Sequence, residues 1–374
     1  MPALANPWRS IAVHRIGVYT EHGLSPSLVE EFMQAAREAG CRGIVDPFVG
    51  SGVVAVEAQK RCFSFLGVDA DPWSLILVAA KTRPLDYDAV LNWTLERLGS
   101  VEELEPLVPS PRLERYHPRE VLTALGRLRR LVEEAPRDWR PLLLAVLGRV
   151  AGEYSLLRRS PAPRFRRGTV EATRHDVYQG FAEALRGAVG DLRGHRFCGP
   201  VDLVWGDSTA WLPGRICGLL TSPPFANNLD YVRHTMLELL WAGLAHGSED
   251  LGWLRGIQMP ACEAAARAWK QETRHPWLRE LASRIRGSRA RGYRRFLLQY
   301  FHAMERHIEL LAGRLEWQAW YTIGDSILGG AYIPVHEALA RLAREYGLQA
   351  ETKPLGERFR PGRRLYLLVL RSRR

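Results

Sequence analysis

The stretch Ser222-Pro223-Pro224-Phe225 places two prolines between a hydroxyl group and an aromatic ring, directly after the apolar run Ile216–Leu220. Because proline lacks an N–H and cannot continue a central strand, the run predicts a buried strand that ends here. The loop that follows is rigid and poor in donors, and its carbonyl oxygens are fixed acceptors. It lies at the carboxyl end of a strand, where open α/β sheets usually bind ligands.

A second candidate site is the stretch "GIVDPFVGSG", which starts at Gly43. A short apolar run breaks at Asp46-Pro47 and continues through a glycine-containing turn into the helical pattern "VVAVEAQKR". The next strand, "FSFLGVDADP", carries Asp69 at its tip. Gly50 and Gly52 allow the backbone to approach a ligand closely, and an acid at this position holds ribose hydroxyls in Rossmann-like folds. The unit therefore predicts a site for a nucleoside cofactor.

Three further parts of the chain complete the predicted fold. Strand patterns stop between Arg83 and about Arg196, where four amphipathic helical runs predict an insertion. The sheet resumes with "PVDLVWGDSTAWL" and "RICGLLTSPPF", and later with "LEWQAWYTIGDS", a helix "IPVHEALARLAREYG" and a closing pair of strands, "ETKPL" and "RRLYLLVLRS". We expect the first half of the sheet in residues 1–84. Residues 85–196 should form a helical insertion, which is a candidate target-recognition region. Residues 197–374 should contain the rest of the sheet and a basic helical segment at about 245–300.

With these pieces placed, the chain resembles the S-adenosylmethionine-dependent nucleic-acid amino-methyltransferases, which modify the exocyclic nitrogen of cytosine or adenine. The family's cofactor motif Asp-Pro-Phe-x-Gly-Ser-Gly is matched from Asp46 to Gly52, and its catalytic Ser-Pro-Pro-Tyr/Phe from Ser222 to Phe225. The resemblance covers nearly all of the predicted sheet, whereas the insertion and the region after Tyr231 match loosely. It implies an α/β, Rossmann-like class I methyltransferase sheet, mostly parallel, with a closing antiparallel hairpin.

The resemblance also implies the site residues. The segment from Tyr19 to Met33 is similar to the one that precedes the family's cofactor loop and closes over the methionine end, and Asp69 and Asp207 stand where the ribose-binding and adenine-binding acids occur. The implied catalytic residues are Ser222, Pro223, Pro224 and Phe225. The implied S-adenosyl-L-methionine contacts are Tyr19, Thr20, Asp46, Pro47, Phe48, Gly50, Ser51, Gly52, Asp69, Ala70, Asp207 and Ser208.

The implied chemistry explains the two prolines. The lone pair of an exocyclic amino nitrogen is delocalised into the base, and acceptors at Ser222 Oγ and the Pro223 carbonyl draw the nitrogen towards tetrahedral geometry. Phe225 stacks on a base that has left its helix. In the family, Ser at the first motif position accompanies N4-cytosine enzymes, and Asp or Asn accompanies N6-adenine and glutamine-modifying relatives. The order of the motifs departs from that of many cytosine-N4 DNA enzymes, so the substrate could be an RNA cytidine as well as cytosine in DNA. If the substrate is DNA, a cognate restriction endonuclease could be a partner.

Several of these residues also have structural interpretations. Asp46 could anchor the glycine loop without touching a cofactor, and Asp207 could cap a helix. Asp230 and Tyr231 are candidates for the target pocket, but a helix N-terminus explains Asp230 equally well. Phe225 alone could be core packing and Ser222 a turn former.

The charge of the chain favours a polyanionic partner. Lys and Arg number 52 against 41 acids, a net charge of +11, and only four of the 52 are lysine. Neutralising phosphates releases counterions, so an excess of this size favours nucleic acid. Genome composition or a hot habitat accounts better for the ratio of arginine to lysine. Two arginine-rich segments with an aromatic residue, "RRSPAPRFRRG" and "SRIRGSRARGYRRF", are candidate substrate contacts through Arg158, Arg159, Arg164, Arg166, Arg167, Arg291, Arg294 and Arg295.

The five cysteines are scattered, without a Cys-x-x-Cys pair or a nearby histidine group. This spacing predicts neither a metal site nor a disulfide framework. The N-terminus lacks an apolar signal region, and no stretch of about eighteen residues is apolar enough to span a membrane. We therefore expect a cytoplasmic protein with no membrane partner.

Overall fold

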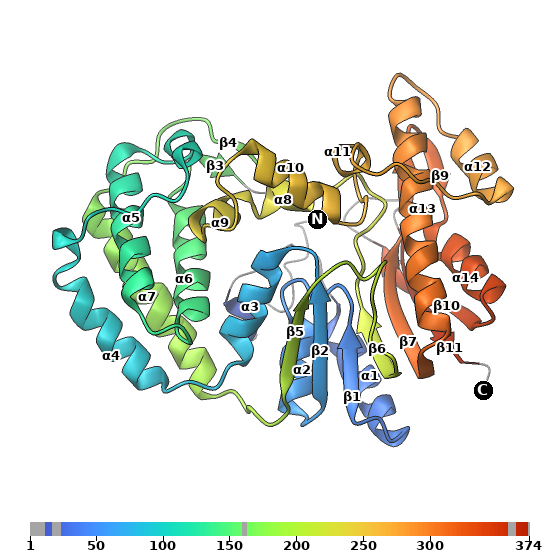
Figure 1. The fold of residues 1–374 in the computed structure, drawn as a ribbon, viewed down its shortest axis with the longest axis horizontal. Coiled ribbons are helices and arrows are strands. Elements are labelled where there is room, and N and C mark those ends of the chain that lie inside the picture. The colour runs from blue at the N-terminus through green and yellow to red at the C-terminus, as the bar shows by residue number, and fades with distance from the viewer. Residues whose placement is uncertain (1–11, 17–23, 159–162, 358–363, 373–374) are drawn as a thin grey trace.

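The computed structural model describes residues 12–16, 24–158, 163–357 and 364–372. Its centre is a seven-stranded sheet in the order β10-β11-β7-β6-β1-β2-β5 (Figure 1). The strands are β1 (Gly43–Asp46), β2 (Ser64–Asp69), β5 (Val201–Trp205), β6 (Ile216–Thr221), β7 (Leu315–Gly324), β10 (Gln349–Glu357) and β11 (Arg364–Arg371). The pairs from β5 to β7 are parallel, and β11 pairs antiparallel with both β7 and β10. The mostly parallel Rossmann-like sheet with a closing antiparallel hairpin, expected from the sequence, is confirmed.

The register brings several strand ends to one edge of the sheet. Asp46 at the end of β1 lies opposite Gly67 of β2, Asp69 lies opposite Trp205 of β5, and Thr221 lies opposite Tyr321 of β7. β1 is flanked by β2 and β6, so the chain order reverses direction across the sheet at this strand. Such a switch point leaves a crevice outside the carboxyl ends of the strands.

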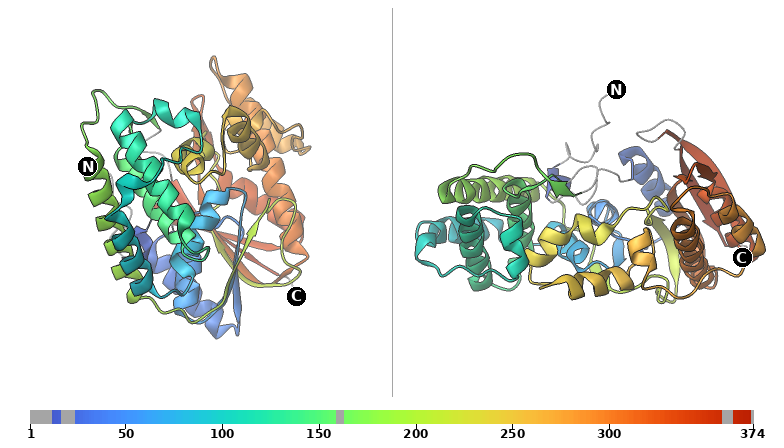
Figure 2. Two further views of the ribbon diagram at one scale, coloured as in Figure 1. Left: turned by 60° about the vertical axis from the view of Figure 1, so that its left-hand side comes forward. Right: turned by 90° about the horizontal axis from the view of Figure 1, so that it is seen from above.

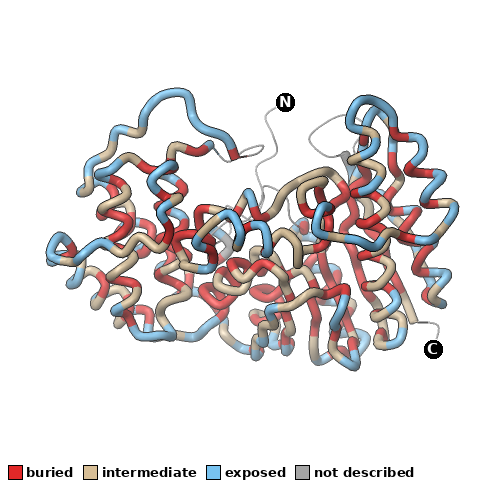
Figure 3. The backbone as a smooth tube through the Cα atoms, turned by 45° about the horizontal axis from the view of Figure 1, so that its top comes forward, coloured by how far each residue is buried: buried red, intermediate tan, exposed pale blue. Residues whose placement is uncertain are grey.

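Helices cover both faces of the sheet because its residues alternate between two apolar sides. Ile44, Leu220 and Trp320 pack with α1 (Pro26–Glu38) and α2 (Val53–Lys60). Their neighbours Val45, Leu219 and Tyr321 pack on the other side with α13 (Ala290–Ala312) and α14 (Val335–Glu345). This period of two is what a strand buried on both faces requires. Buried backbone accordingly runs through the sheet and the inner sides of these helices (Figure 3).

The predicted insertion is helical, but it also contains a small hairpin. Its helices are α4 (Tyr87–Leu98), α5 (Arg119–Glu134), α6 (Arg140–Glu153) and α7 (Arg174–Arg193), with 3-10 turns η3 (Val101–Glu103) and η4 (Pro111–Arg115). They form one apolar core together with α3 (Pro72–Thr82). The expectation that strands stop in this region is wrong at β3 (Leu157–Arg158) and β4 (Arg164–Phe165), which pair antiparallel. Strands of two residues are too short to show a period in the sequence.

A group of short helices lies across the carboxyl edge of the sheet, between the insertion at one end and α13 at the other (Figures 1 and 2). They are α8 (Tyr231–His234), α9 (Met236–Trp241), α10 (Ser248–Ile257) and α11 (Glu263–Ala266). The chain then forms α12 (Pro276–Ser283), and a hairpin of β8 (Ser326–Leu328) and β9 (Ala331–Ile333) follows β7. The turn η2 (Ala12–Arg15) packs against the core of the insertion.

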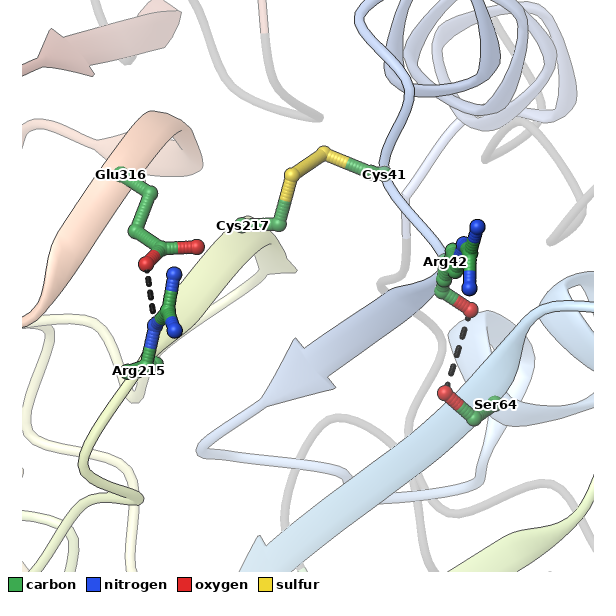
Figure 4. The surroundings of a disulfide bond; sticks show 6 residues. All are labelled: Cys41, Arg42, Ser64, Arg215, Cys217 and Glu316. Atoms are coloured by element: carbon green, nitrogen blue, oxygen red, sulfur yellow. Dashed lines mark hydrogen bonds and ion pairs between the residues drawn. A yellow bond between two sulfur atoms is a disulfide. The ribbon is translucent and has the colours of Figure 1, made fainter.

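The expectation of no disulfide framework is wrong. Cys41, just before β1, is bonded to Cys217 in β6, and Figure 4 shows this bond at the amino ends of the strands. Cys62, just after α2, is bonded to Cys198, just before β5. The bonded partners are 176 and 136 residues apart in sequence, so only the pairing of the strands brings them together. Cys262 is free and buried.

Candidate functional site

The site begins with the loop that joins β1 to α2. Val49 N–H donates to the Val68 carbonyl, 3.1 Å, and Gly52 N–H donates to the Val49 carbonyl, 2.8 Å, which fold the loop back on β2. Gly50 has φ +49° and Gly52 has φ +80°, both in the left-handed region that favours glycine. A Cβ on Gly52 would lie 2.8 Å from Cγ2 of Val78 in α3. The glycines thus permit a turn that packs closely on a neighbouring helix while its other side faces the crevice.

The carboxylates of Asp46 and Asp69 accept hydrogen bonds from backbone N–H groups of this loop. Asp46 Oδ1 accepts from Thr221 Oγ1, 2.6 Å, and from Phe48 N, 3.1 Å. Asp69 Oδ2 accepts from Gly50 N and its Oδ1 accepts from Asp71 N, both 2.8 Å. Burial raises the pKa of Asp46 to about 7 and that of Asp69 to about 6, and these hydrogen bonds oppose the shift only in part. Asp46 Oδ1 therefore anchors the glycine loop to the end of β6.

The catalytic motif expected from the sequence follows β6 directly. The strand ends at Thr221, immediately before Ser222 and the two prolines, as proline's missing N–H predicts. Phe225 is 6% exposed, and its N–H lies 3.5 Å from the Tyr231 hydroxyl. The buried bond from Thr221 to Asp46 ties this loop to the glycine loop of β1.

The two motifs line one pocket at the carboxyl edge of the sheet, which we call the sheet-edge pocket. From the sequence-predicted set, its lining contains Asp46, Pro47, Phe48, Gly50, Ser51, Asp69, Ala70, Asp207, Ser208, Ser222, Pro223, Pro224, Phe225 and Tyr231. Gly52 is absent from the lining, and Tyr19 and Thr20 lie outside the described residues. Residues more than 170 positions apart in the chain thus share one concave surface.

Asp207 and Ser208 enter the pocket through a turn that follows β5. Asp207 Oδ1 and Oδ2 accept from the N–H and the hydroxyl of Thr209, both at 2.8 Å. The side chain therefore caps its own turn, whereas the structural alternative for this residue is a helix cap. The Ser208 carbonyl is 3.0 Å from His307 Nδ1, and His307 Nε2 is 2.7 Å from the Tyr321 hydroxyl. Burial lowers the pKa of His307 to about 4, which keeps the ring neutral at physiological pH.

Sequence reasoning missed a buried lysine beneath the pocket. Lys81 of α3 is fully buried, and its Nζ donates to the Ser51 carbonyl at 2.6 Å. Burial lowers the pKa of Lys81 to about 7. Lys81 stands near the end of a largely apolar helix, and nothing in its sequence surroundings marks it. The pocket also contains Leu24, Val53, Val54, Gln258 and Met259, which belong to no motif.

Asp230 lies outside the pocket lining, although its neighbour Tyr231 lines it. Asp230 Oδ1 caps α8 by accepting from Arg233 N, 3.1 Å, and its Oδ2 is 3.0 Å from Arg255 Nε. The helix-terminus interpretation accounts for the contact with Arg233 N, whereas the contact with Arg255 is an ion pair to another helix, α10.

The two arginine-rich segments differ in structure. In the β3–β4 hairpin, Arg158, Arg164, Arg166 and Arg167 are exposed and line a shallow cavity with Phe165; Arg159 lies outside the described residues. Arg166 is partly engaged, because its Nε donates to the Leu157 carbonyl at 3.2 Å.

The other segment lies at the start of α13, and two of its arginines support the fold. Arg294 donates to the carbonyl groups of Ser283, 3.3 Å, the last residue of α12, and of Ile285, 2.6 Å, two residues later. Arg295 donates to the Trp269 carbonyl, 3.3 Å, whereas Arg291 is exposed. None of the three lines the sheet-edge pocket.

The described residues contain neither a metal-binding group of side chains nor a membrane-spanning helix. In residues 12–16, 24–158, 163–357 and 364–372, no three or more His, Cys, Asp and Glu side chains are grouped so that they could hold a metal ion. Within the same part of the chain, no helix has both the length and the apolar character that crossing a membrane requires.

Comparison with known proteins gives limited likeness. No family model matches the chain. Over 100 residues, 27% of the chain, it is 28% identical to the type II methyltransferase M.MjaII of Methanocaldococcus jannaschii, and the match spans 18% of that protein's length. Among solved structures, the rRNA methyltransferase aviRa from Streptomyces viridochromogenes aligns over 98% of this chain and 96% of that chain, at 11% identity and a TM-score of 0.29.

Proposed function

We propose that this protein is an S-adenosyl-L-methionine-dependent methyltransferase that modifies the exocyclic N4 amino group of cytosine in nucleic acid. The observation that carries the proposal is the shared pocket. The sequence predicts two candidate sites, Asp46–Ser51 and Ser222–Phe225. Both stretches line the crevice at the switch point of the sheet. The match to part of a type II methyltransferase supports methyl transfer as the reaction.

The residues of the sheet-edge pocket fit such a methyl donor. The donor carries an ammonium group, a sulfonium, two ribose hydroxyls and an adenine ring, and when bound it supplies an electrophilic methyl group. Asp46, Asp69 and Asp207 offer carboxylate oxygens, and Leu24, Phe48 and Met259 offer apolar surface. Within the described part of the chain, both hydrogen bonds to Asp46 end on Oδ1, which leaves Oδ2 for a ligand. Gly50 allows the loop backbone to approach the donor.

The catalytic loop would act on the amino group of the base. Ser222 Oγ and the Pro223 carbonyl accept its two N–H groups, so the nitrogen lone pair becomes available for the methyl carbon, and one proton leaves the nitrogen once the N–C bond has formed. The prolines fix these acceptors before the substrate arrives, which makes them more effective than mobile groups. Phe225 and Tyr231 supply aromatic surface for the base.

The choice of base and polymer depends on finer features. Ser222 favours cytosine over adenine, and over the glutamine side chain of a protein substrate. DNA is the substrate we propose first. RNA is the second candidate because the cofactor motif precedes the catalytic motif in this chain.

A product analysis tests the proposal. The protein is incubated with methyl-labelled S-adenosylmethionine and separate DNA, RNA and protein fractions, and the labelled fraction is digested for mass spectrometry. We expect N4-methylcytosine or its ribonucleoside. Label confined to N6-methyladenine would refute the choice of base, and label confined to protein would refute the choice of substrate class.

Single substitutions test the catalytic loop. Ser222→Ala removes a fixed acceptor, and by analogy with other preorganised hydrogen-bonding groups the turnover should fall about a hundred-fold. Phe225→Ala should also be slow and Phe225→Tyr active, and calorimetry should show near wild-type donor affinity for all three. Ser64→Ala is the matched control, since it removes a hydroxyl that donates to the Arg42 carbonyl, 3.1 Å, at the start of β2 (Figure 4). Wild-type turnover in Ser222→Ala would contradict the assignment.

A further inference from the structure

A second concave surface lies beside the sheet-edge pocket, and four arginines from four elements converge on it. They are Arg112 of η4, Arg164 of β4, Arg233 of α8 and Arg255 of α10. We call this surface the arginine groove and define it by these four residues together with Tyr116 and Phe165. Among the residues that the structure describes, its lining contains no Asp or Glu.

The charge of the groove is only partly neutralised. Arg255 pairs with Asp230 at 3.0 Å. Arg112 donates to the Ser248 hydroxyl, 2.5 Å, and Arg233 donates to the Pro163 carbonyl, 2.8 Å, and both of these partners are neutral. A concave surface with an excess of one charge concentrates the field and attracts a polyanion. Three of the four groups come from outside the arginine-rich segments that stand out in the sequence.

The groove also presents an aromatic platform. Phe165 is 53% exposed, and its ring stacks on that of Tyr116, with centroids 6.0 Å apart and planes at 17°. An exposed phenylalanine held at a fixed angle by a second ring, among arginines, offers a surface on which a nucleobase can stack. A base inside a duplex has no free face, so this feature favours an unpaired strand.

Two segments of the chain contribute nearby residues to both the groove and the sheet-edge pocket. Tyr231 of α8 lines the pocket, and Arg233, two residues later, lines the groove. Arg255 of α10 lines the groove, and Gln258, just after the helix, lines the pocket. A strand with its target base in the pocket would therefore reach the groove with neighbouring nucleotides.

We propose that the arginine groove binds an unpaired nucleic-acid strand next to the target base, with phosphates on the arginines and a neighbouring base stacked on Phe165. This inference rests on the proposed function, because it names the form of substrate that the same site accepts. It distinguishes an unpaired strand from a duplex, whereas deoxyribose and ribose strands share the chemistry that the groove recognises.

Binding without a methyl donor tests the groove separately from catalysis. Dye-labelled 12-nucleotide single strands, one DNA and one RNA, and the corresponding DNA duplex are titrated with the full chain and followed by fluorescence anisotropy. We expect at least one single strand to bind about ten-fold more tightly than the duplex. Phe165→Ala should weaken that strand about five- to a hundred-fold, the range for removing one stacked aromatic ring. Phe165→Tyr should restore the binding.

The arginines are tested by the salt dependence of the same titration. Arg112→Gln with Arg164→Gln should weaken binding and lower the slope of log K against log salt by about 0.7 for each phosphate of a single strand that the variant no longer neutralises. The matched control is Arg186→Gln, which removes an exposed arginine of α7 that lines neither the groove nor the sheet-edge pocket. This variant should keep the wild-type slope and affinity.

Two results would overturn the groove proposal. One is duplex binding that equals single-strand binding and is unaffected by Phe165→Ala, and the other is an unchanged salt slope in the Arg112, Arg164 variant. If either occurs while cytosine is still methylated, the groove fails and the proposed function stands. If no nucleic acid is methylated although single strands bind through Phe165, the proposed function fails and the groove stands.

Discussion

At the scale of single residues, Asp46 connects the two loops of the site and carries an electrostatic cost. Asp46 is 3% exposed, and no basic side chain contributes to its pKa. Oδ1 receives the Thr221 hydroxyl and the Phe48 N–H, whereas burial disfavours the ionised form. A ligand with a positive charge near Oδ2 would relieve this cost, so the same residue serves the fold and a cationic donor.

We predict that Asp46→Asn stabilises the protein in a way that depends on pH. The pKa of Asp46 is about 7 in the folded chain and about 4 when unfolded. Below pH 4 the group is protonated in both states and contributes nothing. Between pH 4 and 7 only the unfolded chain loses the proton, so wild-type stability falls as pH rises, by on the order of 4 kcal/mol in total. Asparagine keeps an Oδ1 acceptor and has no such dependence.

Urea unfolding of wild type and Asp46→Asn at pH 4, 5.5, 7 and 8 measures the difference. The advantage of the variant should grow from pH 4 to 7 and then level off. Thr221→Val provides a second check, because the lost hydroxyl donor raises the pKa of Asp46 further and should move the levelling to higher pH. A difference in unfolding free energy that is constant over this range would contradict the raised pKa.

The residues of the site could be predicted from sequence to the extent that local motifs specify them. The stretches from Asp46 and from Ser222 line the pocket because each follows a strand whose end is set by proline and glycine. Lys81, His307 and Tyr321 could not be found in this way, since they belong to ordinary helix and strand patterns and reach the site only through packing. The contacts of Arg294 could not be predicted for the same reason, because the carbonyl groups that it binds are placed by the end of α12.

At the scale of elements, the entry into α2 depends on Gly52. The residue has φ +80°, and a Cβ would lie 2.8 Å from Val78 Cγ2. We predict that Gly52→Ala destabilises the protein by the cost of a left-handed alanine, about 1–2 kcal/mol, and by a further term from the close approach to α3. Because the loop must shift, donor affinity should fall as well.

Gly40→Ala is a matched control for this substitution. Gly40 has φ +78°, and a Cβ there meets no atom within 4 Å, so the variant isolates the backbone term. Urea unfolding should show a larger loss for Gly52→Ala, and Val78→Ala in the Gly52→Ala background should recover part of it. Equal losses of unfolding free energy in the two glycine variants would show that α3 accommodates the added Cβ without loss of stability.

The elements themselves were largely predictable, and the exceptions have a common cause. Strands of the sheet and long helices carry apolar periods over many residues, as in α5 and α14. The β3–β4 and β8–β9 hairpins have strands of two and three residues, which give no period. The arginine groove lies partly on the first of these hairpins, so its geometry was hidden together with the hairpin.

At the scale of the whole molecule, two nested disulfides join the parts of the sheet on either side of the insertion. Cys62–Cys198 closes the chain around residues 63–197, and Cys41–Cys217 encloses that loop. The Cys41–Cys217 bond lies at the amino ends of β1 and β6 (Figure 4), whereas the sheet-edge pocket lies at their carboxyl ends. The bonds therefore act on the stability of the chain and do not touch the pocket.

We predict that opening either disulfide lowers stability with little change in the site. In the chain-entropy model a bond between partners 136 residues apart restricts the unfolded state by about 5 kcal/mol. With that bond intact, the outer bond closes a much shorter path, through residues 41–62 and 198–217, so its own contribution should be about 4 kcal/mol. Removing the inner bond leaves Cys41–Cys217 closing its full loop, so this variant should lose about 4 kcal/mol rather than about 5. Double serine variants of each pair, unfolded in urea under oxidising conditions, measure the two losses.

Because one disulfide loop lies inside the other, the contributions of the two bonds to the unfolding free energy are not additive. Once Cys62–Cys198 is removed, Cys41–Cys217 closes a loop with a separation of 176 residues and should contribute about 5 kcal/mol, more than it does in the intact protein. The loss on removing both bonds should therefore exceed the sum of the two single losses, each measured in the intact protein, by about 1 kcal/mol. Well below the unfolding transition, each single variant should bind the methyl donor as wild type does, because the bonds are remote from the pocket. Strictly additive losses would show that the unfolded chain does not respond to the two loops as a flexible polymer.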